Sequence, residues 1–497
     1  MSGAGDLSHA DLSRADLVAL ALEQADTIAG QAQTIARQDE TIAGLLQRVA
    51  ELERRLSRNS GNSSMPPSTD DLPGRTGPAP REGKKPKRGR GKQPGAAGSA
   101  LGWVDDPDQT VPHFPAGRCG CGADLADAAD AGVVRSHQVH EIPLVTVRVI
   151  QHDLHQVRCD CGTVHTAEQP EQVSAAPASY GANLQALVVY LLVFQHVPVG
   201  RCAQLIADLT GAKPSTGFVH GMLTRAAGVL DQFAKLVKTA ITLAHVVGFD
   251  ETTLRAGKAG TKKYVLSAST EWCTAFFLGG RDLASFKDFG ILPAFTGIAV
   301  HDRYSLYDHR DFPGPAGHQL CGSHLLRDLA DAAEVYPGQH WPQQAARSLR
   351  RLIGAWHDAR DAGQAQIPTA ISAPLVDDLR QAALVGLSYV PRRPGANTKQ
   401  PPARLLLECL RDRQDDVLRF CTDTRIWPTN NISERDLRPL KTQQKISGRL
   451  TSEDVTRDRL TIRGYVSTAV KHGINVMTAL RDAIAGMPWT PPEPAPT

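Results

Sequence analysis

The sequence lacks a segment apolar enough to span a membrane. Residues 182–200 carry no charge, but two glutamines, a histidine and a proline interrupt them, so we expect a buried helix there. An apolar leader is also missing, because residues 1–26 are acidic and rich in serine and do not predict a signal peptide. We therefore expect a cytoplasmic protein without a membrane partner.

Aromatic residues are missing from residues 58–100, which hold seven prolines and eight glycines. Such a composition cannot bury a core, so we predict a disordered linker over 58–110. Within it, residues 81–92 hold seven basic residues and one acid. A solvated charge run is one interpretation, and attraction to a phosphate backbone through counterion release is the other. The candidate DNA contacts in this run are Lys84, Lys85, Lys87, Arg88 and Arg90.

Cysteine is scarce, and four of the nine residues form two close pairs, Cys119/Cys121 and Cys159/Cys161. Paired cysteines favour metal ligation in a reducing compartment over disulfides. Residues 139–150 are rich in β-branched side chains and predict a strand. We predict a β module over 111–170 with a structural four-thiolate Zn²⁺ site. A nearby histidine could replace one thiolate, and free buried cysteines are the alternative.

The N-terminal region repeats every seven residues. Thr-Ile-Ala recurs at 27–29, 34–36 and 41–43. A helix with such an apolar seam is stable only against a second helix, so we predict a coiled coil over 1–57 that joins two or more copies of the chain. A long solvent-exposed helix is the alternative. The seam consists of Ile28, Gln31, Ile35, Gln38, Ile42, Leu45, Val49, Leu52 and Leu56.

Residues 171–240 predict mostly helix. The helical segment 201–210, the break at 211–214 and the helix that Ser215 caps resemble a helix-turn-helix. Any helical hairpin has this pattern, so DNA reading and a scaffold role both stay open.

Two apolar segments farther along the chain each lead to an aspartate. Residues 244–253 contain an apolar run that predicts a strand ending at Asp250. Residues 297–304 contain another that predicts a strand ending at Asp302. Residues 263–269 and 274–279 predict an antiparallel hairpin between them. Two strands that each deliver an acid at the carboxyl end place both acids at one edge of a sheet.

Residues 427–441 predict a helix that begins near Asn430 or Asn431. Glu434 lies in its first turn, where it could complete a capping box with Asn431. An exposed basic stripe beside Glu434 suggests instead a site that holds a metal ion and a phosphodiester together. With the two aspartates, Glu434 makes a three-carboxylate set able to hold two Mg²⁺ ions. The stripe consists of Arg435, Arg438, Lys441 and Lys445.

The segment between the second aspartate and Glu434 predicts mostly helix. Residues 318–328 begin a helix in which Cys321 and His324 lie one turn apart, and residues 325–419 continue as helices with breaks at prolines.

In order, these motifs resemble those of bacterial transposases of the insertion-sequence sixty-six family, over nearly the whole chain. The resemblance implies an RNase H-like core with an Asp-Asp-Glu triad at Asp250, Asp302 and Glu434, and a Cys-x-x-His element at Cys321 and His324. Gly322-Ser323 departs from the larger residues that members tend to carry there, and the Cys-x-Cys spacing is a second departure. The matching segments are 59–68, the two cysteine pairs, 180–184, 248–252, 301–304, 321–324 and 429–435.

The resemblance implies a transposase that binds the ends of its insertion sequence and catalyses metal-dependent strand cleavage and strand transfer. Two Mg²⁺ ions would serve each active site, with His324 as a further catalytic residue. Its partners would be DNA (terminal inverted repeats and target), a second copy of the chain and accessory proteins of the same element, in the nucleoid of a bacterial cell. A zinc-containing, non-catalytic DNA-binding regulator and a nuclease that cuts without joining are the alternatives.

At 497 residues the chain is too long for one domain of usual size. We predict a multidomain α+β fold with an RNase H-like α/β catalytic core that a helical insertion interrupts. The predicted parts are a coiled coil over 1–57, a basic linker over 58–110, a zinc-ribbon-like module over 111–170, a helix-turn-helix-like region over 171–240, core segments over 241–320 and 420–475, the insertion over 321–419, and a helix end with a proline-rich tail over 476–497.

Overall fold

The computed structural model describes residues 13–59, 101–142, 145–170, 173–395 and 398–492. The basic residues between 81 and 92 lie outside the described residues. The chain divides into two compact units. We call Met1–Ala79, Ala176–Pro198 and His220–Thr497 the core unit, and Pro80–Ala175 and Val199–Val219 the cysteine unit.

The N-terminal helix α1 spans Arg14–Ser57. It begins with a capping box, in which the Ser13 hydroxyl accepts from the Asp16 amide and the Asp16 carboxylate accepts from the Ser13 amide. The seam residues Ile28, Ile35 and Ile42 are 64%, 57% and 53% exposed. A single helix thus leaves this apolar seam uncovered, and the coiled coil stays a prediction.

The cysteine unit has little regular structure. Strands β1 (Gln156–Arg158) and β2 (Val164–Thr166) pair antiparallel around the second cysteine pair, and η3 (Leu125–Asp127) follows the first. The predicted strand over 139–150 is wrong for the residues described there, which form no strand. Their β-branched side chains favour a pleated surface only where a partner strand covers them, and β1 pairs with β2 instead.

Helices occur within residues 171–240, where the sequence predicts them. They are α2 (Ala182–Val189), the π-helix η4 (Tyr190–Phe194), α3 (Val199–Thr210) and α4 (Thr216–Val229). The Ser215 hydroxyl accepts from the Phe218 amide, as expected of a cap. The boundary between the two units falls inside α4, so the helix-turn-helix is divided between them.

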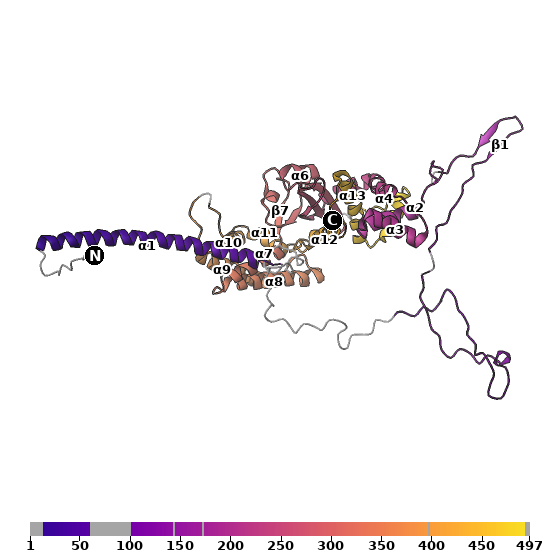
Figure 1. Cartoon of the computed structure of the whole chain (residues 1–497), viewed down its shortest axis with the longest axis horizontal. Coiled ribbons are helices and arrows are strands. Elements are labelled where there is room, and N and C mark those ends of the chain that lie inside the picture. The colour runs from indigo at the N-terminus through magenta and orange to yellow at the C-terminus, as the bar shows by residue number, and fades with distance from the viewer. Residues whose placement is uncertain (1–12, 60–100, 143–144, 171–172, 396–397, 493–497) are drawn as a thin grey trace, which may run out of the picture. The chain divides into compact units, whose positions relative to one another are not determined.

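A mixed five-stranded sheet forms the centre of the core unit (Figure 1). Its strands lie in the order β5-β4-β3-β6-β7. In this sheet β3 pairs antiparallel with β4 and β4 with β5, whereas β6 pairs parallel with β3 and β7 parallel with β6. The strands are β3 (Val246–Leu254), β4 (Lys263–Ser269), β5 (Thr274–Gly279), β6 (Ile298–His301) and β7 (Gly317–Leu320).

Two strand predictions need correction. β3 does not end at Asp250 but continues to Leu254, because β4 pairs with it along this whole length. Residues 317–320 form β7, and the helix predicted from 318 begins only at Gly322. Four residues are too few to reveal a strand by periodicity, and β7 forms because the edge of β6 is available to pair with it.

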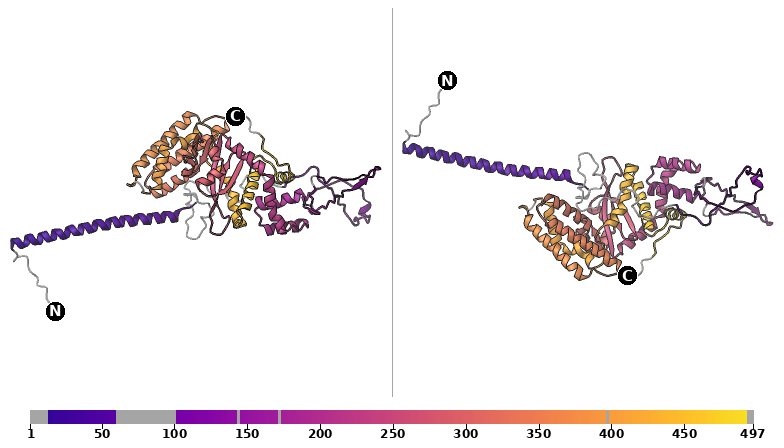
Figure 2. Two further views of the ribbon diagram at one scale, coloured as in Figure 1. Left: turned by 90° about the horizontal axis from the view of Figure 1, so that it is seen from above. Right: turned by 90° about the horizontal axis from the view of Figure 1, so that it is seen from below.

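Helices surround the sheet. The helical insertion packs with buried side chains of β6 and β7 around one hydrophobic cluster, whereas α13 packs against β5 at the other end of the sheet. Figure 2 shows these two groups in orange and yellow. The helices are α5 (Asp231–Thr242), α6 (Leu283–Phe289), α7 (Gly322–Val335), α8 (Trp341–Asp361), α9 (Thr369–Tyr389), α10 (Pro402–Asp412), α11 (Gln414–Leu418), α12 (Asn431–Ile446), α13 (Glu453–Lys471) and α14 (Val476–Ile484), with short helices η5 (Leu292–Ala294), η6 (Ser305–Asp308) and η7 (Arg419–Cys421).

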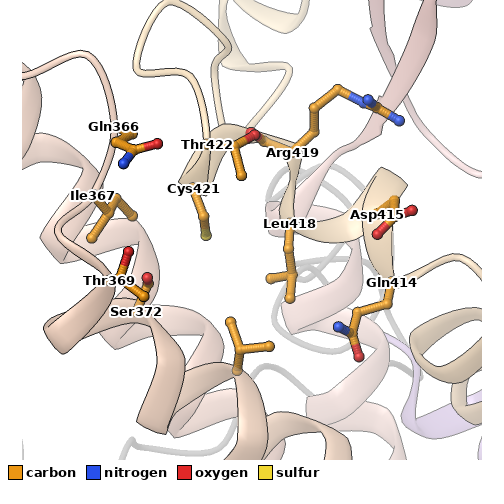
Figure 3. Close-up of a pocket in the computed structure, with 11 residues that line it drawn as sticks. Gln366, Ile367, Thr369, Ser372, Gln414, Asp415, Leu418, Arg419, Cys421 and Thr422 are labelled. Atoms are coloured by element: carbon orange, nitrogen blue, oxygen red, sulfur yellow. The ribbon is translucent and has the colours of Figure 1, made fainter.

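The insertion contains a cavity of about 350 Å³ between α9, α11 and η7. Figure 3 shows the Cys421 thiol and the hydroxyls of Thr369 and Ser372 around it, while Arg419 extends away. Arg419 instead donates to the His318 carbonyl at 3.0 Å. None of the residues that line this cavity was predicted to have a function. Along the described chain, no helix is long and apolar enough to cross a membrane.

Candidate carboxylate site at the sheet edge

The register of the central strands brings the two aspartates together. β3 and β6 run parallel with Gly248 opposite Val300, and their pairing ends there. Asp250 and Asp302 each lie two residues beyond this pair, so they leave the parallel ladder at the same level. The predicted neighbourhood of the two acids is confirmed, although Asp250 lies within a longer strand.

Close packing of α12 on β3 brings in the third acid. A Cβ atom on Gly248 would lie 2.4 Å from Asn430 Oδ1 and 2.5 Å from Ser433 Oγ, so only glycine fits beneath the start of this helix. Asn430 Nδ2 also donates to the Phe249 carbonyl at 2.6 Å. One helical turn later, Glu434 lies close enough for its charge to act on Asp250.

Glu434 does not complete a capping box. Asn430 is the N-cap residue and makes no side-chain capping bond, so Asn431 is already helical and Glu434 is the fourth residue of α12. The Oε1 atom of Glu434 is buried without a hydrogen-bond partner. The capping interpretation is therefore wrong, because the helix start does not use this carboxylate.

The site holds four acids rather than three. Burial, and then the negative charge of the neighbouring Glu251, raise the pKa of Asp250 to about 7. The charges of Glu434 and Asp302 act in the same direction. Burial and then the Asp302 charge also raise the pKa of Glu251. A cluster of buried like charges favours either protonation or a bound cation.

Sequence reasoning missed Glu251 and the groups that hold it. Its side chain is 4% exposed and accepts from Arg281 Nη2 at 2.6 Å and from the Tyr307 hydroxyl at 2.5 Å. Arg281 in turn lies over the Tyr304 ring, 3.8 Å from its centroid. Glu251 follows Asp250 directly in the sequence, but neighbouring side chains of a strand point to opposite faces, so the sequence pattern alone does not assign both to one site.

The start of α7 approaches the site from another side. The Gly322 amide donates to the Pro428 carbonyl at 2.8 Å, and a Cβ atom there would lie 2.9 Å from that oxygen. The Asn430 amide lies 3.2 Å from Cys321 Sγ. The small residue at 322, which departs from the family pattern, therefore permits close contact between α7 and the segment before α12.

Cys321, His324 and Glu434 form a compact group whose ligand atoms all lie within 4.8 Å of one another. His324 Nδ1 lies 4.0 Å from Glu434 Oε1 and has no hydrogen-bond partner. Arg327 Nη2 lies 3.6 Å from the same oxygen. Burial lowers the pKa of His324, but the hydrogen bond and charge of Cys321, together with Glu434, outweigh it and raise that pKa to about 9.

A second group, which was not predicted, begins at the residue before Asp302. It consists of His301, Asp308 and His318. His301 is fully buried, and its Nδ1 faces the Asp302 carbonyl. Its Nε2 lies 3.0 Å from His318 Nδ1, and both Asp308 oxygens accept from Arg413 at 2.8 Å. Because these contacts already occupy the group, we interpret it as a hydrogen-bond network that supports the end of β6.

The basic stripe of α12 faces outward. Arg435, Arg438, Lys441 and Lys445 are all exposed, whereas Leu437 and Leu440 are buried on the opposite side of the helix. The stripe begins one residue after Glu434, so its charges could neutralise phosphates beside the acids.

The two cysteine pairs form matching turns. In each turn the amide of the first cysteine donates to the carbonyl four residues later, at 2.9 Å from Cys119 and 2.8 Å from Cys159. The glycines that follow have φ values of 91° and 92°. All four cysteines are exposed. Among the described residues, two groups of possible metal ligands come together, and neither includes these cysteines, so the zinc site stays a prediction.

Comparison with known proteins gives two family matches. The model of the transposase IS66 family matches residues 177–457, which is more than half of the chain and includes every acid of the site. A family of unknown function, DUF6444, matches residues 21–101. No curated protein matches the chain.

Proposed function

We propose, on the premise that this chain belongs to the transposase IS66 family, that it cleaves DNA strands and transfers the freed ends at the site formed by Asp250, Asp302 and Glu434. One observation carries the proposal. The three acids come from segments far apart in sequence, yet the charges of Asp302 and Glu434 both act on Asp250, just beyond the end of the β3–β6 pairing. DNA would be both substrate and partner, as terminal repeats and as target.

The side chains of the site fit divalent cations. The acids are hard oxygen ligands, which Mg²⁺ prefers. Burial and three neighbouring carboxylates raise the pKa of Asp250, and Glu434 Oε1 is buried without a hydrogen-bond partner, so carboxylate oxygens of the site are available to an ion. When bound, two divalent ions would polarise the attacked phosphodiester and stabilise the attacking and leaving oxygens.

The chain's own residues would then have separate roles. Asp250, Asp302 and Glu434 would hold the ions. Glu251 already accepts hydrogen bonds from Arg281 and Tyr307, so it would hold β3 in place and add negative charge to the site. His324 and Arg327 flank Glu434 Oε1 at 4.0 and 3.6 Å and would orient that carboxylate toward the aspartates.

The basic stripe on α12 would position DNA. Its four cations are exposed along the helix that carries Glu434, so they would neutralise strand phosphates near the acids without reading sequence. From the sequence we also propose that the basic run between residues 81 and 92 contacts DNA, that the cysteine pairs bind Zn²⁺, and that copies of the chain associate through α1.

Glu434→Gln tests the catalytic role. The change keeps the size of the side chain and removes its charge. Because Glu434 makes no capping bond, we expect a folded protein with unchanged affinity for terminal-repeat DNA, and loss of Mg²⁺-dependent cleavage and of strand transfer from a pre-cleaved end.

The matched control is Glu453→Gln, which changes an acid in the first turn of α13 and should leave both reactions intact. A Glu434→Gln protein that still transfers strands would refute the three-carboxylate site. A wild-type protein that cleaves but never joins ends would support the nuclease alternative, and one that binds without cleaving would support the regulator.

A further inference from the structure

Two buried arginines lie one turn apart on α13, away from the carboxylate site. Arg459 and Arg463 are only 7% and 8% exposed. Arginine is rarely buried unless an acid or another acceptor pairs with it. These two side chains therefore need an explanation that the proposed catalytic chemistry does not supply.

The partners of the two guanidinium groups are incomplete. Arg459 Nη1 donates to the Leu192 carbonyl, and Arg463 lies over the Phe194 ring at 5.5 Å from its centroid. The Nε atoms of both arginines are buried without a hydrogen-bond partner. In the described part of the chain, no carboxylate lies within 4.0 Å of either group.

The charge of Asp436 acts on Arg463, but this carboxylate already accepts hydrogen bonds from other groups. Its Oδ2 accepts from Lys471 at 2.7 Å and from two hydroxyls of the sheet, Ser269 and Thr274, at 2.8 Å each. Asp436 therefore anchors α12 to the sheet through Lys471 and the two hydroxyls, and in the described residues it forms no ion pair with either arginine.

A strained residue lies between the arginines and the end of α12. His196 follows the π-helix η4 and, among the described residues, is the one amino acid other than glycine with a positive φ, of 60°. Its carbonyl accepts from the Ser447 hydroxyl at 2.5 Å, and Ser447 is the C-cap of α12. Burial and the charges of both arginines lower the pKa of its ring to about 4. Such strain is often associated with a binding site.

We infer that Arg459 and Arg463 bind an oxyanion of the phosphate class, supplied by the backbone of the DNA on which the proposed function acts. An arginine fork matches the geometry of phosphate oxygens and would receive the compensating charge that the protein lacks. The site would be lined by these two arginines, Phe194 and the neutral ring of His196.

The length of α12 between the carboxylate site and His196 is compatible with a DNA phosphate bound at the two arginines. Glu434 and Ser447 lie 13 residues apart on one helix, which corresponds to about 20 Å at 1.5 Å per residue. The exposed Arg438, Lys441 and Lys445 lie between them. With a rise of about 3.4 Å per nucleotide, this distance spans roughly six nucleotides. The arginines, one of which is under the charge of Asp436, would hold the strand within this distance of the cleaved phosphate.

Thermal unfolding of the full chain tests the anion site. In a phosphate-free buffer, Arg463→Met should unfold at the same or a higher temperature than the wild type, because it removes an uncompensated buried charge. Inorganic phosphate should raise the unfolding temperature of the wild type more than chloride at equal ionic strength. The Met variant should lose this difference, and Arg463→Lys should keep part of it.

The control is Arg457→Met, because Arg457 is exposed on the same helix and paired with Asp454 at 2.7 Å. It should keep the full phosphate effect. A wild type that responds equally to phosphate and chloride would overturn the inference and make the arginines structural. The inference would also be overturned if Arg463→Met were strongly destabilised in phosphate-free buffer and the wild type responded equally to phosphate and chloride.

DNA binding separates the two sources of phosphate. Arg463→Met should weaken binding of end-containing DNA by at least tenfold and reduce the salt slope by about one. An unchanged DNA affinity, with the inorganic phosphate effect present, would overturn the DNA assignment. The result is independent of catalysis, since Glu434→Gln should keep both the phosphate effect and the DNA affinity.

Discussion

The apo protein should become more stable when its most buried catalytic acid is neutralised. Asp250→Asn keeps the shape of the side chain and removes one charge from the four-acid cluster. Most substitutions at buried polar residues destabilise a fold, so the expected sign is unusual. It follows because, among the described residues, no cation lies within hydrogen-bond distance of Asp250, whose carboxylate accepts from the Glu251 amide at 2.9 Å.

The magnitude follows from the pKa of Asp250. Burial, and then Glu251 and the other acids, raise it from 3.8 to about 7. The folded state therefore holds the Asp250 proton more tightly than the unfolded state, and stability falls as pH rises from about 4 to 7. A difference of about 3 pH units at ~1.4 kcal/mol each corresponds to up to ~4 kcal/mol. At pH 8 this is the upper limit of the stabilisation expected for Asp250→Asn, and near pH 4 it should vanish.

Urea unfolding at pH 5 and pH 8, with and without Mg²⁺ or Mn²⁺, measures these effects. The wild type should gain stability from the ions at pH 8 and little at pH 5, where a proton competes for Asp250. Asp250→Asn should show less pH dependence and a reduced response to the ions. The control is Asp436→Asn, which leaves Lys471 buried without its 2.7 Å partner and should cost about 3–5 kcal/mol. An Asp250→Asn protein as unstable as this control would refute the reasoning.

Gly248→Ala should destabilise the protein by ~1–3 kcal/mol and reduce cleavage at least tenfold, because the new Cβ displaces the start of α12. Gly354→Ala, which has open space around it inside α8, should instead stabilise the protein by up to ~1 kcal/mol. Equal unfolding curves for the two variants would contradict this contrast. Metal analysis of the purified chain should find about one Zn²⁺, and Cys161→Ser should lower its affinity; a metal-free protein would refute the zinc site. The double substitution Ile35→Lys, Ile42→Lys should weaken self-association in sedimentation experiments while α1 stays helical, since both residues are exposed on the single helix. An unchanged oligomer would show that another surface joins the copies.

Much of the architecture could be predicted because it depends on local patterns. Apolar runs predicted β3 and β6, the β4–β5 hairpin and the helical insertion. The heptad repeat predicted the long helix α1, and the position of Asn430 predicted the start of α12. The two strand-end aspartates and the acid beside the basic stripe suggested one set of three carboxylates, the family resemblance implied the same set, and the family match covers all of them. Pairs of alternatives, such as capping against metal binding for Glu434, stayed open because both use the same residues.

Tertiary structure decided what depends on close approach and on partners. The segment at 139–150 has strand composition but forms no strand where it is described, whereas the four residues of β7 form one because β6 offers an edge. Gly248 matters only because α12 packs against it. Glu251 joins the site through Arg281 and Tyr307, which lie 30 and 56 residues away in sequence.

Burial is the clearest case of a property that the sequence did not reveal. Arg459 and Arg463 have the spacing of a solvated helix face, yet they are buried beside Leu192 and Phe194, more than 260 residues earlier. Periodicity reports which residues share a helix face. Whether that face meets water, an aromatic ring or a buried anion depends on the elements packed against it, because the energy of a charge is set by its surroundings.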